Sequence, residues 1–167
     1  GESLSAGGLH TCAALDNGSA MCWGYNGYRQ LGDGTTTSTR YSPVNVAGLN
    51  NVKSISAGSI HSCAALDNGS AMCWGYNGYR QLGDGTTYTR SSPVNVAGLN
   101  NVKSISAGSN HSCAALDNGS AMCWGRNSYG QLGDGTTSTR YSPVQVLNLT
   151  NIPVSYTHLR AHETEAY

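Results

Sequence analysis

The sequence predicts an all-β protein, a partial β-propeller of three four-stranded antiparallel blades. The first observation is a repeat, because Cys12, Cys63 and Cys113 head three near-identical copies that start 51 and 50 residues apart. Repeats of about fifty residues are typical of propeller blades. The second observation is that Gly, Asn and Pro interrupt every stretch of a copy before three helical turns could form, which disfavours helices.

Four short β-prone segments occur in each copy and are separated by turn residues. In the second copy we expect strands at Val52–Ala57, His61–Leu66, Ala71–Trp74 and Pro93–Val96, with equivalent strands in the other copies. Pro93 is placed at the start of the fourth strand, where its missing N–H group does least harm to the sheet. Four such strands per repeat are the pattern of a propeller blade.

The composition excludes several function classes. Charged residues make up 11% of the chain and the formal net charge is zero, so no basic surface is expected to bind nucleic acid or anionic lipid. No apolar run approaches the roughly 20 residues that a membrane-spanning helix needs, and we expect no membrane insertion. The 22 Gly and 10 Tyr, with no Phe, are typical of turn-rich β structure.

Each copy contains H-[ST]-C-A-A-L-D-N-G-S-A-M-C-W-G, followed by Q-L-G-D-G-T-T. This pattern resembles the repeat of the regulator-of-chromosome-condensation family over residues 4 to about 152. The resemblance implies a propeller that is usually seven-bladed, so further blades are expected beyond repeats 4–54, 55–104 and 105–153 within residues 1–153. The family's Gly before Gln-Leu-Gly is Gly130 in the third copy, but Arg29 and Arg80 replace it in the others. Either Gly27 and Gly78 take over the turn, or the loop differs in those blades.

Residues 154–167 depart from the repeat. Their Val-Ser-Tyr-Thr-His-Leu-Arg-Ala-His-Glu-Thr string resembles the translation of a sequencing adapter, and we interpret the segment as read-through and not as native protein. No function is therefore assigned to His158 or His162.

The six cysteines form three pairs with a spacing of ten residues: Cys12 with Cys22, Cys63 with Cys73, and Cys113 with Cys123. A three-residue Asp-Asn-Gly hairpin loop places the members of each pair opposite each other, within disulfide reach. A two-residue Asn-Gly loop would instead place Cys63 opposite Trp74. Disulfides would indicate an oxidising compartment: extracellular space, periplasm or cell surface. The alternative is six buried thiols that pack as small apolar side chains.

Other recurring side chains have structural interpretations. His10, His61 and His111 could in principle bind a metal near a propeller axis, but a hydrogen-bonded structural His is the preferred interpretation. The Asp of each Leu-Gly-Asp-Gly loop is expected to cap its own turn, and each Trp to pack between blades with its N–H group bonded. Arg40, Arg90 and Arg140 are expected to form hydrogen bonds between blades.

No catalytic set is recognised in the sequence. It contains no nucleophile elbow, no phosphate-binding loop and no paired carboxylates beyond the repeated turn Asp residues. We therefore expect a protein that is not an enzyme and that uses no cofactor and no metal.

The copies differ mainly in loops, and those differences define a candidate binding surface. Tyr and Arg in variable loops on a rigid scaffold are typical of protein-binding surfaces, although drift in exposed loops would give the same pattern. The candidate binding residues are Leu9, Ile60, Asn110, Tyr25, Tyr28, Tyr76, Tyr79, Arg126 and Tyr129.

These observations favour a secreted or cell-surface propeller that binds another protein of unknown identity. The resemblance adds a concrete example, since the family includes secreted propeller inhibitors of β-lactamases. Two alternatives belong to other classes. One is carbohydrate or cell-wall adhesion through the Tyr loops, and the other is the guanine-nucleotide exchange and chromatin function of the family's namesake.

Overall fold

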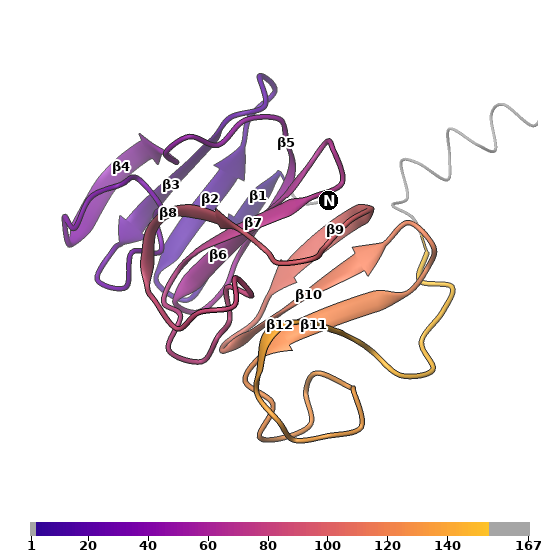
Figure 1. The fold of residues 1–167 in the computed structure, drawn as a ribbon. Coiled ribbons are helices and arrows are strands. Elements are labelled where there is room, and N and C mark those ends of the chain that lie inside the picture. The colour runs from indigo at the N-terminus through magenta and orange to yellow at the C-terminus, as the bar shows by residue number, and fades with distance from the viewer. Residues whose placement is uncertain (1–2, 154–167) are drawn as a thin grey trace, which may run out of the picture.

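The computed structural model describes residues 3–153, and these form three antiparallel four-stranded sheets in chain order (Figure 1). The described residues contain no helix, and hence none that could cross a membrane. The predicted all-β, three-blade partial propeller is confirmed. The strands are β1 (Leu4–Ala6), β2 (His10–Ala14), β3 (Ala20–Tyr25) and β4 (Thr39–Asn45); β5 (Val52–Ala57), β6 (His61–Leu66), β7 (Ala71–Gly75) and β8 (Arg90–Asn95); β9 (Val102–Ala107), β10 (His111–Leu116), β11 (Ala121–Gly125) and β12 (Arg140–Gln145).

The fourth strand corrects one prediction. β8 begins at Arg90, three residues before Pro93, so the proline lies inside the strand and not at its start. Two features make this possible. β8 is the edge strand of its sheet, and its register against β7 shifts between Cys73 and Gly75. A proline is tolerated on an edge strand beside a bulge because no neighbouring strand needs its missing N–H group.

The hairpin register confirms the predicted cysteine pairing. Cys63 lies opposite Cys73, and Ala64 lies opposite Met72, as the three-residue loop requires. The Gly69 N–H group donates to the Leu66 carbonyl at 3.0 Å and closes that loop. All three pairs are disulfide-bonded, with Cα–Cα distances of 4.1, 4.0 and 4.0 Å, and no described cysteine is free.

Neighbouring blades are joined through their first strands. The Ser5 hydroxyl on β1 accepts a hydrogen bond from the Ala57 N–H group on β5 at 3.0 Å. Ser56 accepts from Ala107 on β9 in the same way, at 2.9 Å. The apolar core lies between the sheets, where Trp74 and Trp124 are fully buried. Every residue of β6 is buried because the middle sheet is covered on both faces, whereas β10 of the third blade is buried only in part.

The strand order places the loops at two ends of the blades. The first-to-second and third-to-fourth strand connections meet at one end, which we call the long-loop end. It consists of residues 7–9, 26–38, 58–60, 76–89, 108–110 and 126–139. The Asp-Asn-Gly hairpin loops lie at the opposite end, where the connections between blades also begin; each long loop folds back toward such a connection, as where the Ala47 N–H group donates to the Gly32 carbonyl at 2.8 Å. All nine candidate binding residues are therefore at, or next to, the long-loop end.

Candidate functional site

Buried amides hold each long loop in a fixed shape. The polar side chains of Asn26, Asn77 and Asn127 are fully buried, although they lie in loops with no hydrophobic pattern that would predict burial. The Asn26 side chain accepts from the Leu31 N–H group at 3.1 Å and donates to the Thr37 carbonyl at 2.8 Å. Sequence reasoning missed these residues. The signal that could have found them is that Asn26 recurs in all three copies while its neighbours change.

Four tyrosines form a continuous row across the first two blades. Tyr25 and Tyr28 meet edge to face with ring centroids 6.2 Å apart, and Tyr28 meets Tyr76 of the next blade at 5.4 Å. Tyr76 and Tyr79 then meet at 6.1 Å. Edge-to-face pairs at these distances are favourable, so the row is a stable arrangement of rings.

Arg126 extends the row onto the third blade. Its guanidinium carbon lies 5.1 Å from the centroid of Tyr79 and 5.9 Å from that of Tyr129. A guanidinium over a ring face is attracted by the ring quadrupole. Six of the nine candidate binding residues thus form one surface, which we call the tyrosine–arginine row. It consists of Tyr25, Tyr28, Tyr76, Tyr79, Arg126 and Tyr129.

A paired exchange separates the third loop from the other two. The Tyr76 ring lies so close to Gly78 that a side chain at that position would overlap it, and the Tyr25 ring lies over Gly27 in the same manner. In the third loop, Arg126 and Ser128 stand at these positions, and the Arg126 Nε donates to the Ser128 hydroxyl at 3.0 Å. Gly27 and Gly78 thus make room for a ring, and neither adopts a positive φ.

The expectation that Gly27 and Gly78 take over the turn, or that the loop differs, is therefore wrong. Arg29 and Arg80 themselves adopt the left-handed conformation, with φ of 68° and 66°, matching the 72° of Gly130. The Arg29 guanidinium donates to the Gly27 carbonyl at 3.1 Å. A non-glycine residue in this conformation costs roughly 1–2 kcal/mol, so two loops store backbone strain that the third does not.

This strain gives a direct prediction. Replacing Arg29 with Gly should raise the free energy of unfolding by about 1 kcal/mol, because Gly adopts a positive φ without the steric cost. Urea unfolding measures the change, and Arg29→Ala is the control because Ala keeps the strain. Equal stability of the two variants would show that the left-handed backbone at this position is not strained.

The remaining candidates, Leu9, Ile60 and Asn110, support the row through their backbone. Their carbonyls accept from the N–H groups of Tyr25, Tyr76 and Arg126 at 2.9, 3.1 and 3.0 Å. The Leu9 side chain is 61% exposed, and those of Ile60 and Asn110 are half-buried. They lie beside the row, and within residues 3–153 no side-chain hydrogen bond joins them to it.

Each Asp of the Leu-Gly-Asp-Gly loops caps its turn, as predicted. The Asp134 carboxylate accepts from the Thr136 N–H group at 3.0 Å and from its hydroxyl at 2.7 Å. The Thr136 hydroxyl, followed by its backbone N–H group and Arg140, lowers the pKa of Asp134 to about 2. The expectation that Arg40, Arg90 and Arg140 bond between blades is wrong. Each pairs with the Asp of its own blade, with N–O distances of 3.2, 3.1 and 2.9 Å.

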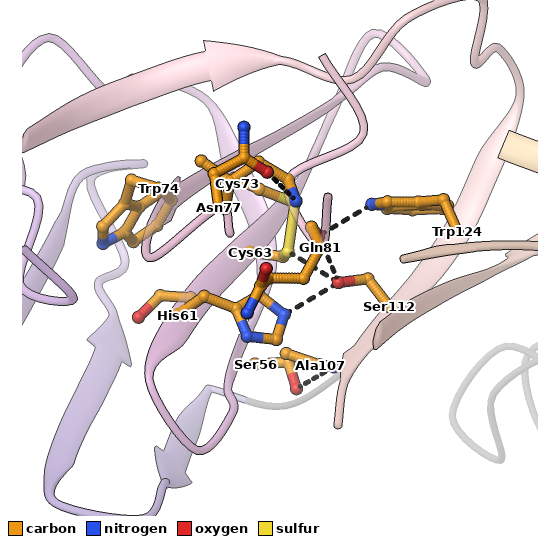
Figure 2. The surroundings of a disulfide bond; sticks show 12 residues. Ser56, His61, Cys63, Cys73, Trp74, Asn77, Gln81, Ala107, Ser112 and Trp124 are labelled. Carbon is orange, nitrogen blue, oxygen red and sulfur yellow. Dashed lines mark hydrogen bonds between the residues drawn. A yellow bond between two sulfur atoms is a disulfide. The ribbon is translucent and has the colours of Figure 1, made fainter. Parts of the chain in front are cut away.

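A buried network joins each blade to the next (Figure 2). The Ser112 hydroxyl donates to the Gln81 carbonyl at 2.8 Å, and the Trp124 indole N–H donates to the same carbonyl at 2.9 Å. His61 Nε2 lies 2.8 Å from the Ser112 oxygen. Because the single hydroxyl proton is directed at Gln81, His61 must be the donor in that bond. His61 and Trp124 therefore have structural hydrogen-bonding roles.

The same network occurs one blade earlier, where His10 bonds Ser62 at 2.7 Å and Ser62 donates to the Gln30 carbonyl. Burial lowers the pKa of His10 to about 4. Burial, followed by the fields of His10 and His111, lowers the pKa of His61 to about 3. Both imidazoles are neutral at pH 7. Within residues 3–153, no cluster of three or more His, Cys, Asp or Glu side chains could hold a metal.

Comparisons with known proteins agree with this geometry. Two sequence profiles of the regulator of chromosome condensation (RCC1) repeat match the chain. One matches residues 2–30, 52–81 and 102–131, and the other matches residues 17–65, 68–115 and 118–158.

Curated relatives include the RCC1 domain-containing protein RUG3, mitochondrial, of Arabidopsis thaliana, which is 35% identical over 83 residues, and protein pim1 of Schizosaccharomyces pombe, which is 36% identical over 87. Each match covers 48% of this chain but only 18% and 16% of the relative. The chain thus spans less than a fifth of the length of these relatives.

Solved structures share the fold. Human WBSCR16 matches with a TM-score of 0.75 and 25% identity over 86% of this chain and 38% of that one. Prp20p of Saccharomyces cerevisiae matches with a TM-score of 0.78 and 20% identity over 98% of this chain and 47% of that one. With three repeat matches over three four-stranded blades, the chain belongs to the regulator of chromosome condensation (RCC1) repeat family.

Proposed function

We propose that this chain is part of a secreted or cell-surface propeller that binds another protein at its long-loop end and catalyses no reaction. The tyrosine–arginine row carries the proposal. Tyr28 and Tyr79 are 41% and 39% exposed and Tyr129 is 85% exposed, so large amphipathic rings face outward on a rigid frame. Tyr and Arg are the side chains that most often dominate the energy of protein interfaces.

The three disulfides support the oxidising compartment in this proposal. Disulfides persist outside the cytosol and are rare within it, where thiols are kept reduced. Each blade has one, and those of the first two blades are fully buried. The curated relatives include a mitochondrial protein, and an extracellular location for this chain is therefore a proposal that rests on its own cysteines.

Further blades are part of the same proposal. Trp74 and Trp124 are fully buried against the preceding blade, whereas the equivalent Trp23 of the first blade is partly exposed. Tyr41, also in the first blade, is 96% exposed. We propose that blades flanking residues 1–153, with repeats 4–54, 55–104 and 105–153, cover these side chains and close a ring. The segment 154–167, interpreted as read-through, lies outside the described residues.

Protein binding is favoured over the alternatives for two reasons. The solved neighbours are described by their binding of proteins: Prp20p with Gsp1p and histones, and yeast RCC1 with Kap60. The neutral, charge-poor chain and its disulfides disfavour a nuclear exchange or chromatin function. Inhibition of a partner enzyme is the most concrete form of the proposal. Carbohydrate adhesion shares the exposed rings but gives no account of Arg126.

Affinity capture with the whole chain tests the proposal. Immobilised wild-type chain should retain at least one protein from the secreted and surface fractions of the source cells. The triple variant Tyr28→Ala/Arg126→Ala/Tyr129→Ala should fail to retain that protein. The dissociation constant for that protein, measured by calorimetry, should rise at least thirtyfold, because a binding hot spot contributes about 2 kcal/mol or more.

The control is Asn100→Ala, an exposed substitution at the opposite end of the blades, which should leave the affinity unchanged. The melting temperatures of both variants should stay within a few degrees of wild type. Tyr76 is left intact because its ring lies against Gly78 and fills the space within its own loop. Release of the captured protein by soluble glycans would favour adhesion, and equal retention by the triple variant would refute the proposed surface.

A further inference from the structure

Two equivalent grooves run between successive blades at the long-loop end. In the first groove, the Gly34 N–H group donates to the Ser91 carbonyl of the second blade at 2.9 Å. In the second groove, the Gly85 N–H group donates to the Tyr141 carbonyl of the third blade at 3.0 Å. The backbones match, and so do Arg29 and Arg80, which both adopt the left-handed conformation. Two of the side chains that line the first groove differ in the second: Ser91 stands where the second groove has Tyr141, and Tyr76 stands where it has Arg126.

The second groove is filled by the protein itself. The guanidinium carbon of Arg80 lies 4.1 Å from the centroid of the Tyr141 ring. The Arg80 Nη2 also donates to the Tyr141 hydroxyl at 2.7 Å. The ring and the hydroxyl are thus both recognised by one arginine, which is the geometry expected for a bound phenol.

The first groove is open. A depression of about 410 Å³ lies there, lined by Tyr28, Arg29, Tyr76, Thr89 and Ser91 among others. The Arg29 guanidinium is held by the Asn26 and Gly27 carbonyls at 3.3 and 3.1 Å, and no carboxylate of residues 3–153 pairs with it. The depression therefore offers an unneutralised cation between two tyrosines, which complements an electron-rich ring. It is continuous with the tyrosine–arginine row through Tyr28 and Tyr76.

We propose that this depression is a socket for the phenol ring of a tyrosine on the partner protein. Arg29 takes the part that Arg80 plays toward Tyr141, and the small Ser91 side chain leaves the space for the ring. The inference rests on the proposed function, since it names the partner group that the row receives. It assigns to Ser91 the role of keeping the socket open.

Binding of p-cresol, the side-chain analogue of tyrosine, tests the socket without the partner. Titration of the whole ¹⁵N-labelled chain should shift the amide signals of Tyr28, Arg29 and Ser91 along a saturable curve. Ser91→Tyr should lower the affinity for p-cresol at least tenfold, because the new ring fills the socket as Tyr141 fills its groove. This variant is expected to fold, since Tyr41 and Tyr141 occupy the same position in the other blades.

Three matched variants sharpen the result. Ser91→Ala should bind p-cresol as wild type does, and Arg29→Gly, which takes the residue of the third blade, should lose binding while staying folded. Tyr141→Ser should open a second socket, seen as new shifts around Arg80. Unsaturable shifts in the wild type, or an unchanged affinity of Ser91→Tyr for p-cresol, would overturn the proposal.

The partner separates this inference from the proposed function. If the captured protein binds the Ser91→Tyr variant as tightly as it binds the wild type, the proposed binding surface is retained and the socket proposal is refuted. If p-cresol binds as expected but no protein depends on the tyrosine–arginine row, the socket stands and the proposed function fails.

Discussion

Reduction of the three disulfides should abolish the cooperative thermal unfolding of this chain at neutral pH. Each disulfide joins residues with a sequence separation of ten, and the chain-entropy description gives such a loop about 2.7 kcal/mol, or about 8 kcal/mol for all three. Domains of this size are stable by roughly 5–15 kcal/mol in total, so the loss is comparable to the whole. Thermal unfolding followed by circular dichroism, with and without a phosphine reductant, measures this loss of stability. Mass spectrometry after alkylation counts the free thiols.

The Cys63→Ala/Cys73→Ala variant is the matched control for a single bridge. Its free energy of unfolding should fall by about a third of the loss caused by full reduction, because the two other blades keep their disulfides. A fully alkylated chain with six labelled thiols that melts at the wild-type temperature would contradict the prediction. Quantitative alkylation before any reductant is added would remove the argument for an oxidising compartment.

Acidification should destabilise the chain between pH 7 and pH 5, well above the range in which most carboxylates titrate. The folded-state pKa values of His10 and His61, about 4 and about 3, lie below the ordinary value of 6.5. Between those values the unfolded chain binds more protons than the folded one, so the free energy of unfolding falls as pH falls. The loss is about 2 kcal/mol per histidine at pH 5, or about 4 kcal/mol for the two.

The physical cause is the direction of the hydrogen bond. His61 already donates from Nε2 to Ser112, and within residues 3–153 its Nδ1 has no partner, so a second proton would be a buried and unpaired charge. Urea unfolding at pH 7, 6 and 5 measures how the free energy of unfolding changes with pH. His61→Gln should be less stable at pH 7 but should show about half the pH dependence. A free energy of unfolding that is flat over this range would contradict the assigned burial of both rings.

The hairpin was predictable from sequence because local rules determine it. The Asp-Asn-Gly loop sets a three-residue turn, which fixes the register of Cys63 against Cys73 and makes the disulfide possible. β5 and β6 were predicted to the residue for the same reason, since turn residues bound them on both sides. The position of Pro93 inside β8 was not predictable, because it depends on the bulge opposite β7.

The candidate site was predictable only as a set of residues. Loop variation pointed to Tyr25, Tyr76 and Arg126, but their assembly with Tyr28 into one row depends on how neighbouring blades meet. Arg80 was out of reach for another reason. Arginine has no preference for a positive φ, and its contact with Tyr141 joins residues 61 apart in the sequence.

The paired exchange of Tyr76 and Gly78 for Arg126 and Ser128 indicates that two side chains of each long loop can be replaced together while the loop backbone keeps its shape. Two positions change together, while the buried Asn77 and Asn127 hold both versions in the same way, each accepting from the leucine five residues on. A combinatorial library confined to these two positions in each blade would therefore vary the chemistry of the surface without disturbing the scaffold. Affinity for a new target could be selected from such a library independently of folding.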